Sequence, residues 1–529
     1  MKIMIINTGG TISCVGTPLA PMTARAFADA FRQLVEPALL QAFPDLTLSY
    51  ATDLTFPQSA TGMLDSTNLQ PTDWCLMAEH ILTHYEDVDG WVVLHGTDTM
   101  QASGMALPLL LSRFAPDGTR LAGLSKPVIL TGSQAPLFYA PSTDSPQALN
   151  FNTDAFQNVC GAIAAAQSGI PDVCVFFDSL LFRGSRVVKT DTGQFRGFDA
   201  PNNGPLGRHG IRFTLDARVL PPAPVSRTAS LDDRAARAAT AAQLVAIRNA
   251  LPALRVAELS AFPAPYHPEQ GTALLADLIN GFVAQGVRGL VLRSYGAGNF
   301  PSGHPRTPEE GAIYKALSAA NEAGVIIMDN TQVQHGAVDY NAYAAGAWLP
   351  GIGALNPVDM TPSASLAKLT VLLAAAEANG WRLADVKFLM QLPLVGEMAD
   401  LSRLDNRGNA MLAPGQSLST FNGAARLTNH PEKGPLLTDN NGQVVWAMLE
   451  TTKDTELPGT LRVEADGNLV FMSRNNDLLW ASNTAVAGRA PSQLRLTAST
   501  EGILLELYDY AALKRTWCFA TSEKETKAL

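Results

Sequence analysis

No uninterrupted apolar run in this 529-residue sequence is long enough to span a bilayer, and the mean hydropathy is only +0.06. Charge is also scarce, since charged residues make up 16% of the chain and the formal net charge is −10. The chain therefore lacks the clustered Lys and Arg that nonspecific binding to phosphate backbones requires. We expect neither a membrane span nor a nucleic-acid partner.

Cysteine is equally scarce. The five cysteines are odd in number, widely scattered and free of C-x-x-C spacing, namely Cys14, Cys75, Cys160, Cys174 and Cys518. This pattern indicates neither a disulfide framework nor a zinc site, and it fits a reducing compartment. The segment Lys2–Asn7 has the pattern of a buried strand running directly into Thr8, which leaves no room for a signal peptide's apolar core and cleavage site. We expect a cytoplasmic protein.

The sequence does contain the patterns of several domains. Single hydrophobic cores stop growing near roughly 250 to 300 residues, so a chain of this length divides. Within residues 1–200, short apolar runs at Lys2–Asn7, Gly90–Leu94, 127–130 and Val173–Phe177 alternate with helical patterns. This alternation predicts an α/β domain with a mostly parallel sheet.

Residues 201–250 are rich in turn residues, proline, alanine and arginine, and we expect them to form a linker. A second, smaller α/β domain is expected at 251–400. Its predicted strands lie at 254–259, 289–293 and 324–328, and its predicted helix at about 364–378.

The last part of the chain, residues 405–522, has a different sequence pattern. Short alternating strands are separated by Asn/Gly turns, which predicts an all-β module. Trp446, Trp480 and Trp517 follow similar strand-turn-strand patterns and lie 34 and 37 residues apart. This repeat predicts three related faces.

Hydroxyl, acidic and basic side chains follow the expected strands of the first domain. The first three strands lead into Thr8-Gly9-Gly10-Thr11, His95-Gly96-Thr97-Asp98-Thr99 and Thr131-Gly132-Ser133-Gln134, and Lys189 follows the fourth. In open α/β sheets, ligands bind outside the carboxyl ends of the strands. Each segment alone also fits a simpler role: a glycine turn, a helix cap at Asp98 or Thr99, or a solvated lysine. A Thr–Asp–Lys set can shuttle the proton that a threonine must lose before it attacks a carbonyl.

The ordered combination of these segments, with Asp65-Ser66 and Lys189-Thr190, resembles the asparaginase family, especially its type I, cytoplasmic branch. The resemblance covers about residues 1 to 390. It implies a two-domain α/β fold, homodimers or homotetramers with active sites at subunit contacts, and no metal or organic cofactor.

The resemblance also assigns catalytic roles. Thr11 matches the threonine that attacks the side-chain amide of asparagine to give an acyl-enzyme. Thr97, Asp98 and Lys189 match a second set, in which the threonine aids catalysis and the lysine lowers the cost of deprotonation. In that set the aspartate also binds the α-ammonium of the substrate.

Substrate-binding residues are implied in the same way. Ser66 matches the serine that binds the α-carboxylate, with Thr67 beside it. Ser133 matches the loop that closes the pocket near the amide, and Asn299 matches a type I segment in the second domain.

Two positions depart from the family pattern. Leu19 falls near the place of a mobile-loop tyrosine that activates the nucleophile, and Tyr295 is our hypothetical substitute for it. Ser363 stands where a glutamate normally reaches the substrate of a neighbouring subunit. Loss of that carboxylate is expected to weaken recognition of the amino end of the substrate.

The C-terminal module resembles the bulb-type, mannose-binding lectins, whose β-prism has three four-stranded faces. Gly415-Gln416-Ser417-Leu418 and Leu479-Trp480-Ala481-Ser482 carry part of the likeness. The resemblance implies an all-β prism over residues 405–522.

The sugar motif of that lectin family, Q-x-D-x-N-x-V-x-Y, is kept only in part. The middle repeat has Asp466, Asn468 and Val470 at the inner positions, but Glu464 and Met472 at the outer ones. The module is therefore either a candidate carbohydrate-binding domain or a structural and assembly module that has lost sugar binding.

The predicted activity is hydrolysis of L-asparagine to L-aspartate and ammonia through a threonine acyl-enzyme. Its nearest rival is an amidase for glutamine, a D-isomer or a glutaminyl adduct of tRNA, and the lack of basic surface speaks against the last. The alternative from another class is an inactive asparaginase-fold platform whose lectin-like domain binds glycans or mediates assembly.

Overall fold

The computed structural model of the chain describes residues 1–116, 118–141, 147–216, 229–340, 342–399, 401–406, 410–420, 424–449, 456–499, 502–509, 512 and 514–522. The described residues form two compact units, one up to residue 399 and one from residue 401 on. Within these ranges, no helix has the length and apolar character needed to cross a membrane.

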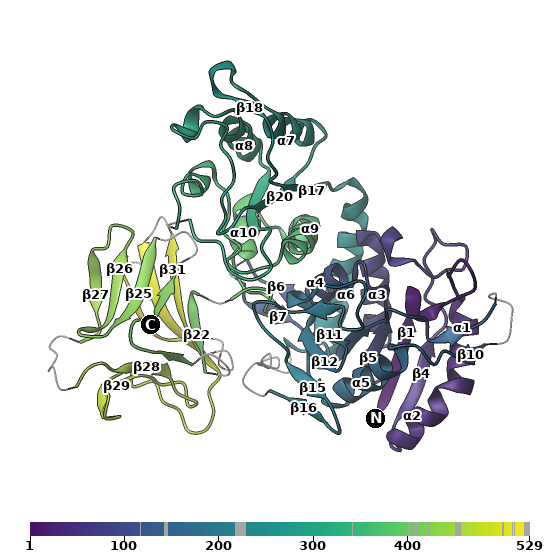
Figure 1. The fold of residues 1–529 in the computed structure, drawn as a ribbon. Helices are drawn as coiled ribbons and strands as arrows, with labels where there is room; N and C mark the ends of the chain where they lie inside the picture. The colour runs from purple at the N-terminus through teal and green to yellow at the C-terminus, as the bar shows by residue number, and fades with distance from the viewer. Residues whose placement is uncertain are drawn as a thin grey trace. The chain divides into compact units, whose positions relative to one another are not determined.

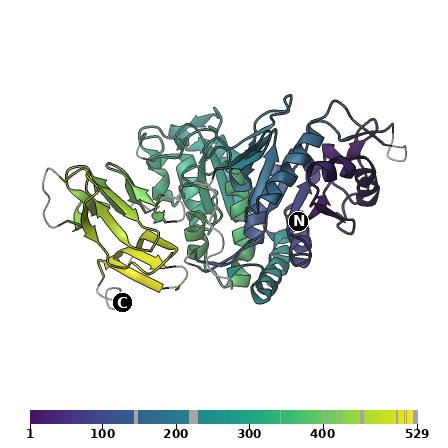
Figure 2. The same cartoon turned by 90° about the horizontal axis from the view of Figure 1, so that it is seen from below.

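Eight strands form the large sheet of the first unit, in the order β16-β15-β12-β11-β8-β5-β1-β4 (Figures 1 and 2). Neighbouring strands from β4 to β11 pair in parallel, whereas β12, β15 and β16 join antiparallel. Their bounds are β1 Lys2–Asn7, β4 Thr47–Ala51, β5 Gly90–Leu94, β8 Val128–Thr131, β11 Val173–Phe177, β12 Leu180–Arg183, β15 Gly207–His209 and β16 Phe213–Leu215. The four predicted strands are β1, β5, β8 and β11, and the prediction of a mostly parallel sheet is confirmed.

Helices cover this sheet and connect its strands. They are α1 Ala24–Leu34, α2 Glu36–Ala42, α3 Pro71–Thr83, α4 Met100–Leu110 and α5 Ala155–Gln167. Helix α5 packs against β5, β8 and β11, and α4 packs against α3 and β11. Because both faces of the central strands are covered, every residue of β5 and β11 is buried.

The linker expected at residues 201–250 is not what the described residues show. Strands β15 and β16 extend the large sheet, and α6 (Arg234–Ala250) packs against α3 and α9. Asp233 caps α6 by accepting from the Ala236 amide at 2.9 Å. Alanine and arginine are strong helix formers, so the composition that suggested a linker is the composition of a helix. The proline-rich segment 221–224 lies outside the described residues.

A second α/β part completes the first unit. Its parallel sheet has the order β17-β20-β21, close to the three predicted strands. The elements are β17 Val256–Ser260, α7 Leu274–Ala284, β20 Gly289–Ser294, α8 Ala312–Glu322, β21 Ile326–Thr331, α9 Pro362–Asn379 and α10 Leu383–Met390. Helix α9, the predicted helix, begins after the capping Thr361 and ends at Gly380, which has a left-handed backbone.

The second unit is built from three antiparallel four-stranded sheets, coloured light green to yellow in Figure 2. Their orders are β22-β31-β32-β33, β23-β28-β29-β30 and β24-β25-β26-β27. The strands are β22 Arg403–Asp405, β23 Met411–Leu412, β24 Ser417–Ser419, β25 Ala425–His430, β26 Gly434–Asp439, β27 Val444–Ala447, β28 Thr460–Val463, β29 Leu469–Met472, β30 Leu478–Ala481, β31 Ser492–Ser499, β32 Gly502–Asp509 and β33 Lys514–Ala520.

The three repeated tryptophans occupy equivalent places in these sheets. Trp446, Trp480 and Trp517 each lie in the last strand of a sheet, β27, β30 and β33 respectively. The ring of Trp446 is 6.5 Å from that of Trp480 and 5.8 Å from that of Trp517, and the last two rings are 5.6 Å apart. The repeat in the sequence therefore corresponds to three sheets that share one aromatic centre.

Candidate active site

The strand order places the ends of β1 and β5 at the switch point of the parallel sheet. The chain passes from β1 to β4 on one side and then returns to β5 on the other side of β1. Ligands of such sheets bind outside the carboxyl ends of the strands where the order reverses. Thr11 follows β1 as the first residue of a short 3-10 helix, and Thr97 follows β5. The two predicted catalytic threonines thus emerge from neighbouring strands.

Glycine lets three loops meet at this edge. A Cβ on Gly10 would lie 2.3 Å from the Gly96 Cα, and a Cβ on Gly96 would lie 2.4 Å from the Ser66 Oγ. Gly10 also has a φ of 75°, which glycine adopts without strain. The glycine turn is therefore structural, and it brings the loops that carry Thr11, Ser66 and Thr97 into direct contact.

Lys189 connects the two members of the second predicted set. Its Nζ donates to Thr97 Oγ1 at 2.8 Å and to Asp98 Oδ1 at 2.7 Å. Its backbone amide donates to Gln101 Oε1 at 2.8 Å, which fixes the lysine backbone against the start of α4. Lys189 is thus a partly buried, hydrogen-bonded residue, and the structure assembles the Thr–Lys–Asp set from residues about 90 positions apart.

Neither Asp98 nor Thr99 caps helix α4. Thr99 occupies the N-cap position without a side-chain capping bond, and its Oγ1 instead donates to Ser66 O at 3.0 Å. The Asp98 carboxylate pairs with Lys189, and its side chain is half exposed. The helix-cap interpretation is therefore wrong, and the Asp98 carboxylate is accessible to a cationic group of a ligand.

The residues predicted to bind substrate lie on the surrounding loops. Ser66 is buried, whereas Thr67 is exposed and donates its hydroxyl to Asp65 Oδ1 at 3.0 Å. Ser133 is buried and donates to Ala135 O at 2.5 Å, so its hydroxyl holds its own loop. The roles of Ser66, Thr67 and Ser133 toward a substrate stay predictions.

His95 supports the site, although our sequence analysis assigned it no role. Its ring is fully buried, with Nδ1 2.7 Å from Gly96 O and Nε2 2.9 Å from Ser103 Oγ. Ser103 Oγ also accepts from Trp74 Nε1 at 3.1 Å. Burial lowers the pKa of His95 to about 4, so the imidazole is neutral and fits a tautomer that donates to Gly96 O. One feature of the sequence could have indicated this role, because His95 is a polar residue that directly follows the apolar strand β5.

A cavity of about 320 Å³ lies beside Lys189, between the two α/β parts of the unit. Arg293 and Ser363 line it from the second part. A buried ion pair between Arg186 and Asp359, with 2.9 Å between Nη1 and Oδ1, ties the two parts together. Within one chain, Ser363 thus shares a cavity with the catalytic lysine candidate.

The loop after Thr11 is a short hairpin. Strands β2 (Cys14–Val15) and β3 (Ala20–Pro21) pair antiparallel, and Leu19 in their connection is 54% exposed. Tyr295 follows β20 and is also exposed, and within the described residues its side chain forms no hydrogen bond with Thr11. The role of Tyr295 as a substitute for the missing phenol stays a prediction.

The candidate sugar-binding residues of the second unit have structural partners. Asp466 accepts from the Asn468 amide at 3.1 Å, and Asn468 Oδ1 accepts from Ser482 Oγ at 3.1 Å and from the Thr484 amide at 3.2 Å. Val470 is buried. These contacts organise the turn between β28 and β29, and carbohydrate binding stays a prediction.

Comparison with known proteins identifies the family to which the first unit is similar. The family models described as "Asparaginase, N-terminal" and "Glutaminase/Asparaginase C-terminal domain" match residues 2–219 and 272–380. L-asparaginase 1 of Escherichia coli strain K12 is 30% identical over 374 residues, covering 70% of this chain and 92% of that protein. The 60 kDa lysophospholipase of Mus musculus is 30% identical over 414 residues, covering 75% of this chain and 62% of that protein.

A solved structure, L-asparaginase I of Vibrio cholerae, is similar with a TM-score of 0.54 and 26% identity, covering 75% of this chain and 99% of that one. The chain therefore belongs to the asparaginase family, a family of amidohydrolases. The residues matched by the two family models end at 380, so these models describe the first unit only.

Proposed function

We propose that the protein is an asparaginase that hydrolyses L-asparagine to L-aspartate and ammonia. The observation that carries this proposal is the Lys189 ammonium held between Thr97 and Asp98, at the switch point where Thr11 also emerges. An open α/β sheet offers its ligand site at that edge. A hydroxyl nucleophile beside a Thr–Lys–Asp set is suited to acyl transfer.

In the first step, Thr11 Oγ bonds to the side-chain amide carbon of asparagine. The hydroxyl proton passes to the amide nitrogen, which leaves as ammonia, and the Lys189 ammonium, which donates to Thr97 and Asp98, lowers the cost of this deprotonation. Backbone amides near Thr11 and Thr97 stabilise the oxyanion formed on the way. Water then attacks the acyl carbon, supplies the hydroxyl of the new carboxyl group, and returns a proton to Thr11.

Substrate recognition uses opposite charges at the two ends of the amino acid. The accessible Asp98 carboxylate binds the α-ammonium, and the loop at Ser66 and Thr67 binds the α-carboxylate. Ser133 positions the loop that covers the amide. The site needs no metal or organic cofactor in this mechanism.

We extend the proposal to location and assembly. All five cysteines lie in described segments and are free, which fits a reducing, cytoplasmic environment. The similar structure from Vibrio cholerae is an L-asparaginase I. We propose for this chain the homodimer or homotetramer that the resemblance to the type I branch implies. Sedimentation equilibrium tests this assembly directly.

The test is ammonia release from L-asparagine, L-glutamine and D-asparagine by the purified protein, with fatty-acid release from a lysophospholipid measured in parallel. We expect turnover of L-asparagine, and a loss of kcat/KM of at least about 10³-fold in Thr11→Ala and Lys189→Met, because each removes a member of the proton-transfer system. The matched controls are Thr272→Ala, at an exposed position of the second α/β part, and Lys315→Met on the exposed face of α8.

Two results would reject the proposal. If the folded wild type released no ammonia from any of the amides, the alternative of a catalytically altered or inactive asparaginase fold would be favoured. Leu19 and Ser363 would then be the changed positions. Activity that survives in both Thr11→Ala and Lys189→Met would place the chemistry elsewhere.

A further inference from the structure

We propose that Asp53, His80 and His84 form a binding site for one divalent transition-metal ion, separate from the threonine site. His80 lies in the last turn of α3 and His84 is the C-cap residue of that helix. Asp53 comes from the loop that follows β4. One nitrogen of each imidazole and one carboxylate oxygen all lie within 4.8 Å of one another.

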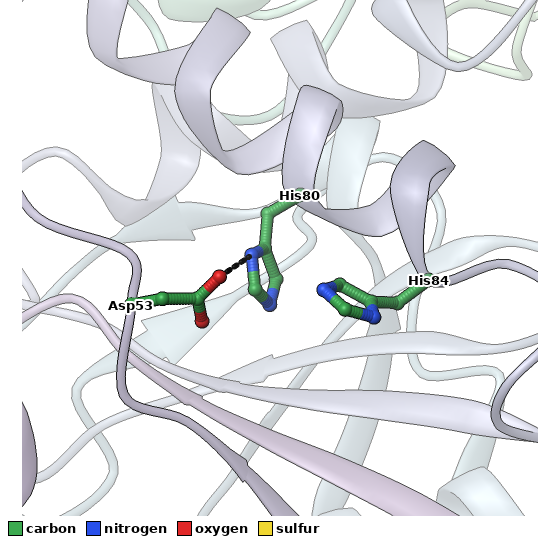
Figure 3. A group of neighbouring side chains, drawn as sticks. All are labelled: Asp53, His80 and His84. Atoms are coloured by element: carbon green, nitrogen blue, oxygen red, sulfur yellow. Dashed lines mark ion pairs between the residues drawn. The ribbon is translucent and has the colours of Figure 1, made fainter.

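The spacing on the helix explains this convergence. Residues four apart lie on the same helical face, so the rings of His80 and His84 are neighbours, with centroids 4.6 Å apart and planes tilted by 48°. Figure 3 shows the Asp53 carboxylate on one side of the His80 ring and a His84 nitrogen directed toward the other side. His80 Nδ1 is 4.0 Å from Asp53 Oδ2.

His80 supplies an independent indication of a ligand. Its side chain is only 7% exposed, and its Nε2 is buried without a hydrogen-bond partner among the described residues. A buried polar atom is normally satisfied, because leaving it unpaired costs its full desolvation penalty. A metal ion bound between the two imidazoles would give His80 Nε2 the partner that the described residues do not provide.

Asp87 orients the second histidine for this role. Its Oδ2 lies 2.8 Å from His84 Nδ1, so the carboxylate accepts that N–H and leaves the His84 Nε2 lone pair free. A carboxylate that accepts from the noncoordinating nitrogen is the usual second partner of metal-binding histidines. The C-terminal end of α3 also carries partial negative charge, which favours a cation there.

The ligand set selects the class of metal. Two imidazoles and one carboxylate suit Zn²⁺, Ni²⁺ or Cu²⁺, whereas Mg²⁺ and Ca²⁺ require oxygen ligands. Ligand atoms around tetrahedral zinc lie about 3.3 to 3.5 Å apart, given bonds near 2.0 to 2.1 Å. The Asp53 side chain is 72% exposed, so it is free to move the remaining distance. Bound metal would fasten the loop after β4 to the end of α3.

The experiment is calorimetric titration of the full chain, purified without a histidine tag and treated with chelator, using ZnCl₂, NiCl₂ and MgCl₂. We expect one Zn²⁺ or Ni²⁺ per chain and no detectable Mg²⁺ binding. Asp53→Asn and His84→Gln should weaken Zn²⁺ binding by at least tenfold, and Asp87→Ala by about 10- to 100-fold. His267→Gln, at an exposed histidine far along the chain, should bind as the wild type does.

A second readout guards against misfolded variants. Near-UV circular dichroism should be the same for the wild type, Asp53→Asn and His84→Gln, since the Asp53 side chain is mostly exposed, that of His84 is partly exposed, and both substitutions keep a polar side chain of similar size. Zn²⁺ should raise the thermal midpoint of the wild type and of His267→Gln, but not of the two site variants. Absence of saturable Zn²⁺ binding, or equal affinity and stoichiometry in wild type, Asp53→Asn and His84→Gln, would overturn the proposal.

Discussion

At the scale of single residues, the close approach of the Gly10 and Gly96 backbones constrains the active site. We expect Gly10→Ala to reduce kcat/KM for asparagine by roughly 100-fold, because the displaced loop would move the Thr11 hydroxyl by about 1 Å. It should also lower the free energy of unfolding by about 1 to 3 kcal/mol, the usual cost of a left-handed nonglycine residue. Kinetics and urea denaturation measure the two effects.

Gly169→Ala is a matched control for that substitution. Gly169 has a φ of 71°, close to that of Gly10, but a Cβ placed there would have no heavy atom within 4 Å. The Gly169→Ala variant should therefore lose free energy of unfolding as Gly10→Ala does, but should keep the kcat/KM of the wild type. Equal catalytic losses in the two variants would show that close approach to Gly96 is not what positions Thr11.

The candidate site could be predicted from the sequence only in part. Thr11 and Thr97 stand directly after buried strands, and this local pattern was enough to place both at the carboxyl edge of the sheet. The contacts of Lys189 with Thr97 and Asp98 depend on the path of the chain over about 90 residues, which no local pattern encodes. The burial of His95 likewise results from tertiary packing.

At the scale of elements, helix α6 contributes to the stability of the first unit, although our sequence analysis did not predict this helix. Leu244 is 3% exposed on the face of α6 that packs into the unit, and its neighbour Val245 is exposed. We expect Leu244→Ala to lower the free energy of unfolding by about 2 to 5 kcal/mol, because it removes buried methyl groups and leaves a cavity. Val245→Ala should change it by less than about 0.5 kcal/mol. Urea denaturation compares them, and similar small losses would mean that α6 is peripheral.

The strands were the predictable elements, and the reasons are physical. Strands β1, β5, β8 and β11 are buried on both faces, so each is a continuous apolar run in the sequence. Strands β15 and β16 lie at the antiparallel edge and have exposed residues, so they carry no such signal. Helix α6 was missed because small and basic residues dominate it, although its buried positions Ala236, Thr240, Leu244 and Ile247 recur with helical spacing.

Strand β21 contains a group that makes stability depend on pH. Asp329 is fully buried, and burial raises its pKa to about 8 despite a hydrogen bond from the Ser294 hydroxyl. The folded state therefore keeps a proton that the unfolded chain loses near pH 4. The stabilising contribution of this proton is fully present below about pH 4 and is lost as the pH rises through about 8.

Asp329→Asn tests this linkage, because the amide copies the shape of the protonated acid. We expect the free energy of unfolding of the wild type to decrease from pH 5 to pH 9, and that of the variant to decrease less. Urea denaturation at pH 5, 7 and 9 gives both profiles. Parallel profiles would mean that Asp329 is ionised in the folded protein.

At the scale of the whole molecule, the chain contains an α/β unit with the candidate active site and a second unit made of three antiparallel sheets. The first unit contains the matched family residues, the switch-point site and the cavity beside Lys189. The second unit was predictable as an all-β repeat because its three tryptophans recur at nearly equal spacing, and they meet at one centre in the structure. The proposed mechanism uses residues of the first unit only.

The central claim for the molecule is that Thr11 becomes covalently acylated. Rapid acid quenching during turnover of L-asparagine, followed by peptide mass spectrometry, tests it most directly. The account predicts an aspartyl ester on the peptide that contains Thr11, and no such adduct in Thr11→Ala, which should also be inactive. An adduct on another residue, or turnover that persists in Thr11→Ala, would contradict it.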